Sequence, residues 1–327
     1  MTNTFMLSHP NSVFGSSKGS DRANQQRWLV LKRLVAVLLS VGLMAAVPSL
    51  AADSSSSNKQ QLQSASSKAV QSQVDKQTAD AAREKRKQLL SDATAAIAQT
   101  QQALKALEDK KNDVALKALA DATGKLELIV TRDPSLKLAP IATQVVTFDV
   151  FADPQTLKLA IAEAKDALSD GDIPRARPLV EALASETQIR TTNIPLATYP
   201  SAIKAITPLI DSGKIDEAKT KLQTALNTLV VTTEVIPLPK LRAENLLKEA
   251  QALAEKKDRS KDDNDKLANQ LKTVREQLQI AELLGYGKKR DFQPMYAQLE
   301  SIEKTSAGGK SGSGWFDKIR KQVAEAF

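Results

Sequence analysis

The segment TSAGGKSGSGWF, residues 305–316, contains the residue types that close a phosphate-binding loop. Residues 309–311 supply the Gly-Lys-Ser end of that motif, in which backbone N–H groups and the lysine hold the phosphates of a nucleotide. The first glycine of the motif would have to stand at position 304, which is Lys304, and the preceding pattern is helical where the motif requires a strand. We therefore interpret residues 305–314 as a flexible Gly/Ser linker and not as a nucleotide site.

The side chains on which most enzymes depend are missing after residue 51. The chain has no cysteine, and its one histidine, His9, lies in the N-terminal segment. This leaves no thiol nucleophile, no imidazole base and only the Met295 thioether as a soft metal ligand. The acidic run KDDNDK, residues 261–266, lacks the glycine and the distal glutamate of a calcium loop. We predict no catalytic residue, no cofactor and no metal; an enzyme using carboxylate, lysine or tyrosine chemistry is the third-ranked hypothesis.

Residues 1–51 have the pattern of a secretory signal peptide. Basic residues between positions 22 and 33 precede an uncharged apolar run, residues 34–47, which is too short to span a bilayer comfortably. A proline ends the run and small residues follow it, so we predict a cleavable signal that is cut after Ala51. An uncleaved inner-membrane anchor is the alternative, and the true start codon could lie downstream of Met1.

Removal of this signal changes the charge of the protein. Residues 1–51 carry five basic side chains and one acidic side chain, so the net formal charge falls from +8 to +4. A mild positive charge spread over helices of mixed sign is not typical of a nucleic-acid-binding surface. The next segment, residues 52–80, is rich in Ser and Gln and is predicted to be a disordered or weakly helical leader.

A helix–turn–helix unit recurs three times in residues 81–304. Each copy has two apolar residues and an intervening alanine at the same spacing: Leu107, Ala115 and Leu119; Leu168, Ala176 and Val180; Ile210, Ala218 and Leu222. Gly171 and Gly213 suit a left-handed turn position, and Asp113, Asp172 and Asp216 are placed to cap the second helix. The distances between copies are unequal, which argues against a regular solenoid. We predict an all-α fold, an irregular bundle of related antiparallel helical hairpins.

Three β-branched segments that end in proline separate the helical units: residues 144–154, 191–200 and 230–239. They could pair as short strands, but two of them contain internal prolines, so we interpret them as extended connectors. After them, Ser260 and Asp263 form a capping box before a heptad-like apolar seam.

Residues 315–327 are predicted to form an amphipathic helix, tethered to the bundle by the linker at 305–314. Three placements stay open for this helix: on its own bundle, on a partner subunit, or on a membrane surface. The membrane is the weakest of them because the helix has little net charge.

Aromatic and polar residues in the connectors and near the C-terminus could line a groove for a small ligand or a protein partner. The candidate residues are Arg190, Thr192, Asn193, Tyr199, Tyr286, Phe292, Trp315 and Phe316. The alternative is that the aromatic side chains fill gaps where the connectors cross the bundle.

Several segments resemble the YfdX family of exported enterobacterial proteins. They are ALSDGDIPRARPLVEAL, NIPLATYPSAIK, LIDSGKIDEAKTKLQTALNTLVVTTEVIPLPKLRA, AEKKD and ELLGYGKKRDF, and the likeness extends over residues 91–316. The resemblance implies an α-helical periplasmic protein linked to acid and heat tolerance. It offers no catalytic motif that could be carried over to this sequence.

Our leading hypothesis is a non-enzymatic periplasmic stress-tolerance protein that binds unfolding clients and forms a homo-oligomer, with no nucleic-acid partner and no stable membrane insertion after signal cleavage. Protonation of its 37 remaining carboxylates around pH 4 would raise the net charge towards +41, and self-repulsion would then loosen helix pairs. The second hypothesis is a periplasmic binding module for a small ligand or a specific protein partner.

Overall fold

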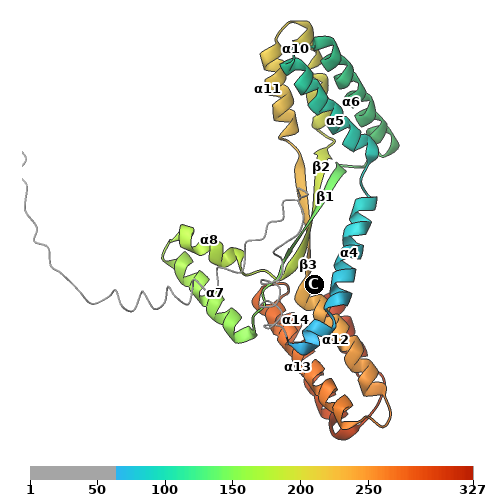
Figure 1. Cartoon of the computed structure of the whole chain (residues 1–327), viewed down its shortest axis with the longest axis vertical. Helices are drawn as coiled ribbons and strands as arrows, with labels where there is room; N and C mark the ends of the chain where they lie inside the picture. The colour runs from blue at the N-terminus through green and yellow to red at the C-terminus, as the bar shows by residue number, and fades with distance from the viewer. Residues whose placement is uncertain (1–63, 327) are drawn as a thin grey trace, which may run out of the picture. The chain divides into compact units, whose positions relative to one another are not determined.

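The structure is a computed structural model and describes residues 64–326. The predicted signal peptide, the first part of the leader and Phe327 lie outside the described residues. The described part is mainly helical with one three-stranded sheet, which confirms the broad all-α prediction (Figure 1). The elements in chain order are α3 (Ala65–Ala69), α4 (Gln71–Lys87), α5 (Ser91–Glu108), α6 (Asn112–Arg132), β1 (Leu138–Phe148), α7 (Pro154–Ser169), α8 (Ile173–Glu181), β2 (Glu186–Pro195), α9 (Tyr199–Lys204), α10 (Thr207–Asp211), α11 (Ile215–Leu226), β3 (Val230–Pro237), α12 (Leu238–Glu255), α13 (Lys261–Leu283), α14 (Lys289–Ser306), the 3₁₀ helix η1 (Ala307–Gly309) and α15 (Asp317–Glu325).

The three predicted hairpins are present as α5–α6, α7–α8 and α10–α11. One hydrogen bond closes each turn in the same way, from a backbone N–H to the carbonyl five residues earlier. These bonds are Lys111 to Ala106 at 2.8 Å, Asp172 to Ala167 at 3.0 Å and Lys214 to Leu209 at 2.8 Å. Gly171 and Gly213 have φ of 70° and 75°, the left-handed conformation that was predicted for them. In the first hairpin Lys110 occupies this position with φ of 60°.

The predicted caps of the second helices are correct at one hairpin of three. The Asp172 carboxylate accepts a hydrogen bond from the Arg175 N–H at 3.2 Å and caps α8. Asp113 and Asp216 instead lie in the first turns of α6 and α11, two residues after the N-cap, where a carboxylate still interacts favourably with the positive end of the helix dipole. The capping box of Ser260 and Asp263 at α13 is confirmed.

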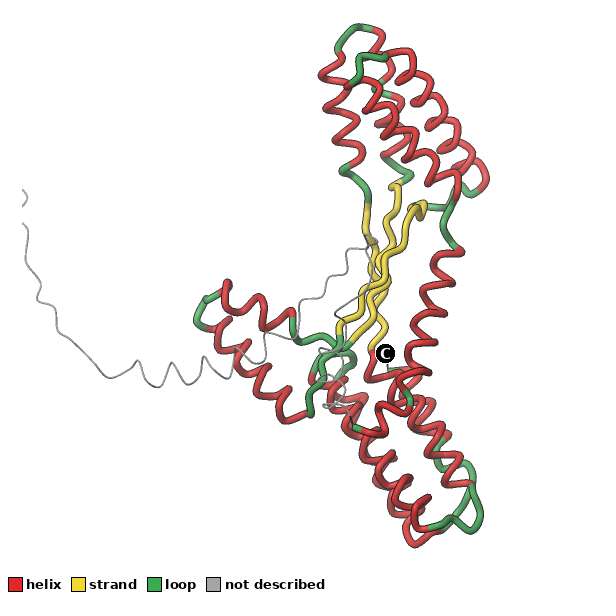
Figure 2. The backbone as a smooth tube through the Cα atoms, in the orientation of Figure 1, coloured by secondary structure: helices red, strands yellow, loops and turns green. Residues whose placement is uncertain are grey.

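The extended connectors pair as strands, and our preference for unpaired connectors was wrong. The strands form an antiparallel sheet in the order β1-β2-β3 (Figure 2). The two prolines that argued against pairing stand at the last positions of their strands, Pro195 in β2 and Pro237 in β3. At a strand end the missing proline N–H does not interrupt the hydrogen bonds between the strands. β1 and β2 also begin before the segments recognised in the sequence, at Leu138 and Glu186.

Two apolar cores occupy different parts of the described chain. The first joins the hairpins α5–α6 and α10–α11 with α9 and the adjoining ends of β1 and β2. The second joins α12, α13, α14 and α15, and includes the predicted heptad-like seam of α13. The buried residues of α7 and α8 belong to neither core.

The C-terminal helix packs on its own bundle and is not held away from it by a tether. Phe316, Ile319 and Val323 are buried in the second core. The preceding segment is fixed as well, because the Arg259 guanidinium donates to the Ser306 carbonyl at 3.1 Å and to the Lys310 carbonyl, and the Gly312 N–H donates to the Ala254 carbonyl at 3.1 Å. The expected linker therefore forms part of the folded structure.

The second half of the predicted leader is helical. α3 begins at Ala65 and α4 at Gln71, and Val70 and Val74 are fully buried against residues of the C-terminal half of the chain. None of the helices in residues 64–326 combines the length and apolar character that a bilayer-spanning segment requires.

Candidate functional site

The sheet has one face that a helix covers and one that is open. Successive residues of a strand point to opposite faces, and directly paired residues share a face. The Lys85 ammonium of α4 lies 2.8 Å from the Glu234 carboxylate, which places α4 on the face that also carries Ile189, the residue paired with Glu234. Arg190 and Thr192 therefore lie on the opposite face, whereas Asn193 lies on the α4 face.

The open face consists of three cross-strand rows whose side chains are exposed or half-buried. The rows are Ala142, Thr192 and Val231; Gln144, Arg190 and Thr233; Val146, Gln188 and Val235. At its centre the Arg190 guanidinium donates to the Gln188 amide oxygen at 2.6 and 3.0 Å, and no carboxylate in the described part of the chain forms an ion pair with it. Val231 and Val235 are 57% and 44% exposed. The surface thus combines an unneutralised cation with apolar side chains along one edge.

Strand β3 is the edge beside those valines. It pairs with β2 on one side, and within residues 64–326 no strand lies on its other side. Natural edge strands usually carry charges, prolines or bulges that prevent pairing with another chain. β3 reads VVTTEVIP, so its one charged residue is Glu234, which Lys85 pairs, and its proline stands at the last position. Its outer edge is therefore available to an added strand.

A cavity of ≈ 570 Å³ lies on the covered face, between the C-terminal end of α4, the hairpin α5–α6 and the sheet. Its apolar lining includes Leu89 and Leu138, and its polar lining includes Thr191, Asn193 and Thr232. The Asn193 amide is held by the strands, since it donates to the Thr191 carbonyl at 2.8 Å and to the Thr232 hydroxyl at 3.1 Å. This volume is within the range of small-molecule sites.

Three of the four charged side chains that line this cavity are in ion pairs, and the fourth, Asp133, accepts hydrogen bonds from Ser135. The Asp92 carboxylate lies 2.9 Å from the Arg132 guanidinium and 3.6 Å from the Lys125 ammonium, and Lys85 is paired with Glu234. A charged ligand would therefore have to compete with existing ion pairs. An uncharged, partly apolar ligand fits the lining better.

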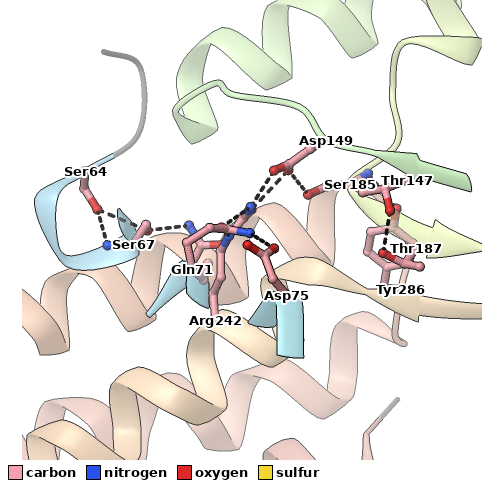
Figure 3. Close-up of polar contacts among 11 residues, drawn as sticks. Ser64, Ser67, Gln71, Asp75, Thr147, Asp149, Ser185, Thr187, Arg242 and Tyr286 are labelled. Atoms are coloured by element: carbon pink, nitrogen blue, oxygen red, sulfur yellow. Dashed lines mark hydrogen bonds and ion pairs between the residues drawn. The ribbon is translucent and has the colours of Figure 1, made fainter. Parts of the chain in front are cut away.

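A buried polar network connects five segments that are distant in the sequence (Figure 3). The Arg242 guanidinium of α12 donates to both carboxylate oxygens of Asp149, just after β1, and to the amide oxygen of Gln71 in α4. Asp149 also accepts from the Ser185 hydroxyl at 2.8 Å, and the Ser185 N–H donates to the Tyr286 hydroxyl at 2.9 Å. Burial, reinforced by Glu186, raises the pKa of Tyr286. The network fastens the ends of β1 and β2 to α4 and α12.

A second cavity of ≈ 320 Å³ adjoins this network. Arg242 and Gln277 line it together with the apolar side chains of Phe151 and Ile280. The Gln277 amide oxygen is buried and has no hydrogen-bond partner in the structure. The guanidinium, however, is already occupied by Asp149 and Gln71, so the arrangement favours a structural role for Arg242.

The eight residues predicted to line one groove are distributed over separate parts of the fold. Arg190 and Thr192 are on the open face, and Asn193 is in the cavity on the other face. Tyr199 is fully buried in the first core, and burial raises its pKa although the nearby Thr100 hydroxyl acts in the opposite direction. The remaining four belong to the second core: Phe292 and Phe316 are buried in it, and Tyr286 and Trp315 pack against it. For these aromatic residues, the gap-filling alternative describes the structure better than a groove.

Residues 64–326 contain no cluster of three or more His, Cys, Asp or Glu side chains that could hold a metal ion. The sequence interpretation did not single out Asp149, Ser185 and Arg242, which form the buried polar network. Arg242 had a detectable signal, because it stands with Asn245 among Leu238, Leu241, Leu246 and Leu247 in a helix that is buried on several sides.

The described part of the chain is thus a mainly helical protein with a small antiparallel sheet that has one open face. The YfdX family model matches residues 96–235, which run from within α5 to Val235 of β3, and this match supports the assignment of the chain to the YfdX family. Among solved structures, YfdX from Salmonella Typhi is similar at 15% identity, over 46% of this chain and 93% of that chain, with a TM-score of 0.32. No curated protein matched the sequence.

Proposed function

We propose that this protein is a non-enzymatic, exported stress-tolerance protein that binds unfolding polypeptide chains in the periplasm. The observation that carries the proposal is the open face of the sheet with its unprotected edge strand β3. An unfolding chain exposes backbone N–H and C=O groups and apolar side chains, and an edge strand can pair with the first while exposed valines contact the second. The mode of binding is β-strand addition.

Strand addition suits clients of many sequences, because main-chain hydrogen bonds supply most of the affinity. Arg190 adds a preference, since an unneutralised cation at the centre of the face favours client segments that carry carboxylates or free carbonyl groups. Acid and heat are the conditions that the family resemblance implies, and protonation of carboxylates below about pH 4.5 would increase the exposure of apolar surface.

The double substitution Val231→Lys and Val235→Lys tests the surface. We expect the variant to fold with wild-type stability and to lose suppression of client aggregation, because lysines on an edge strand oppose strand addition. Val114→Lys with Val130→Lys is the matched control, since both valines are exposed on α6, at 43% and 38%. Aggregation is measured by light scattering at neutral pH, at pH 4 and on heating. If both variants suppress client aggregation equally, the client does not bind at β3. If the wild type does not suppress aggregation under any of these conditions, the chaperone proposal is wrong.

A small-molecule binding module is the second candidate, and the cavity of ≈ 570 Å³ behind the sheet favours it. A ligand in this cavity should raise the melting temperature of the wild type and of Thr192→Trp, whose side chain is on the open face. It should not raise that of Thr191→Trp, whose indole would fill the cavity. A ligand effect that survives Thr191→Trp would exclude this cavity.

A further inference from the structure

The three related hairpins differ in the burial of their equivalent apolar residues. In the first hairpin Leu107 and Leu119 are each 1% exposed, and in the third Ile210 and Leu222 are 4% and 0% exposed. At the same two positions of the second hairpin, Leu168 and Val180 are each 48% exposed. Ile173, the first residue of α8, is 50% exposed. The second hairpin therefore has the same apolar face as the first and third hairpins, but this face is exposed.

The reason for the difference is the partner of each hairpin. Hairpins α5–α6 and α10–α11 contact each other and share the first core, so each covers the apolar face of the other. Hairpin α7–α8 packs internally through Ala164, Ala167 and Ala176, and its α7 contacts α13 (Figure 1). Within residues 64–326, no hairpin of the same kind is left to cover it.

We propose that this face is an interface between two copies of the chain, in which the α7–α8 hairpin of one copy packs on the α7–α8 hairpin of the other. The first and third hairpins show the element that covers such a face, namely another hairpin with the same spacing. A symmetric pair places the same apolar face on both sides of a two-fold axis. Charge permits the contact, because residues 154–181 carry four basic and five acidic side chains and are close to neutral.

The inference does not depend on client binding, because the open sheet face and the α7–α8 face are separate surfaces. It gives the predicted homo-oligomer a defined contact. Client binding without self-association, or self-association without client binding, would therefore reject one proposal and leave the other standing.

The mass of the exported protein in solution, measured by light scattering during size exclusion over a range of concentrations, tests the interface. We expect a dimer for the wild type and a monomer for Leu168→Lys with Val180→Lys. A lysine at either position is near the C-terminal end of its helix, where the dipole favours a cation. The control is Leu128→Lys with Leu159→Lys, two leucines that are 48% and 73% exposed, the second on the opposite side of α7. The control should remain a dimer.

A second measurement covers the case in which the double lysine variant fails to fold. The chain has no cysteine, so a single Val180→Cys can be cross-linked with a short bis-maleimide, with Leu159→Cys as its control. We expect covalent dimers from Val180→Cys and few from Leu159→Cys. A wild type that is monomeric at every concentration, a dimer that survives both lysines, or equal cross-linking of the two cysteines would overturn the proposal.

Discussion

Arg242 and Asp149 form an ion pair that is almost removed from solvent, with side-chain exposures of 4% and 12%. A buried pair of this kind contributes little compared with apolar residues of the same volume, but removal of one partner leaves an uncompensated charge. Arg242 of α12 also donates to Gln71 of α4, and Asp149 accepts from Ser185 just before β2, so the main effect of the pair is to fix how these segments meet. This ion pair therefore determines the arrangement of the fold through two single residues.

We predict that Arg242→Met lowers the free energy of unfolding by about 3–5 kcal/mol, because Asp149 would stay buried without its partner. Urea unfolding measures the change. Arg190→Met, at the half-buried centre of the open face, should change stability by less than about 0.5 kcal/mol. Adding Asp149→Leu to Arg242→Met should recover most of the loss. An unchanged stability of Arg242→Met would contradict the structural role of the network.

Asp263 should make the stability of the folded protein depend on pH, in a direction that follows from its pKa. The Lys256 ammonium, with the Ser260 backbone and hydroxyl, lowers the pKa of Asp263 from 3.8 to about 2. A carboxylate whose pKa is lower in the folded state stabilises that state above its unfolded pKa, and the contribution is lost as the pH falls towards the folded value. Asp263→Asn should therefore be less stable than the wild type at pH 7, and the two urea midpoints should converge between pH 4 and pH 2. Asp262→Asn, in the same helical turn, is the control. A difference that stays constant over this range would disprove the assignment.

At the scale of elements, the sequence predicted those parts of the fold that depend on local interactions. The hairpins, the left-handed glycines 171 and 213, and the Ser260–Asp263 capping box follow from residues within one or two turns of each other. Pro208 stands in the first turn of α10, where a proline is tolerated and where the preceding helix α9 has already ended.

The sheet could not be predicted in the same way, because its strands pair across helices. Gln144 pairs with Arg190 and Arg190 pairs with Thr233, so each register depends on the folding of an intervening hairpin. The prolines in these segments argued against strand pairing, because their positions at the strand ends cannot be read from the sequence alone. The positions of the candidate site residues could not be predicted for a related reason: aromatic residues such as Tyr199 and Phe292, which lie in the two cores, give no local signal that separates a core position from a groove.

For the C-terminal helix we predict that Phe316→Ala lowers the free energy of unfolding by about 3–5 kcal/mol, since the ring is 1% exposed in the second core. Lys318→Ala, an exposed change in the same helix, should have no effect beyond about 0.5 kcal/mol. Thermal or urea unfolding gives both values. Equal stability of Phe316→Ala and the wild type would mean that the helix leaves the core in solution, as a tethered helix would.

At the scale of the whole molecule, two surfaces remain without partners in the described part of the chain. The α7–α8 face repeats a pattern that the other hairpins bury, and we assign it to self-association. The open sheet face has no such internal counterpart; its exposed valines and free edge suit chains of many sequences. Two surfaces with different chemistry allow self-association and client binding to occur together.

Hydrogen exchange during client binding tests the central claim most directly, because it reports which backbone amides become protected. The protein without residues 1–51 is mixed with an unfolding client at pH 4 and at neutral pH, and exchange is followed by mass spectrometry. We predict that residues 230–235 of β3 gain protection in the complex, more strongly at pH 4, while residues 85–92 around the cavity do not change. Protection confined to residues 85–92, or no change in β3 while the client is bound, would contradict strand addition at this edge.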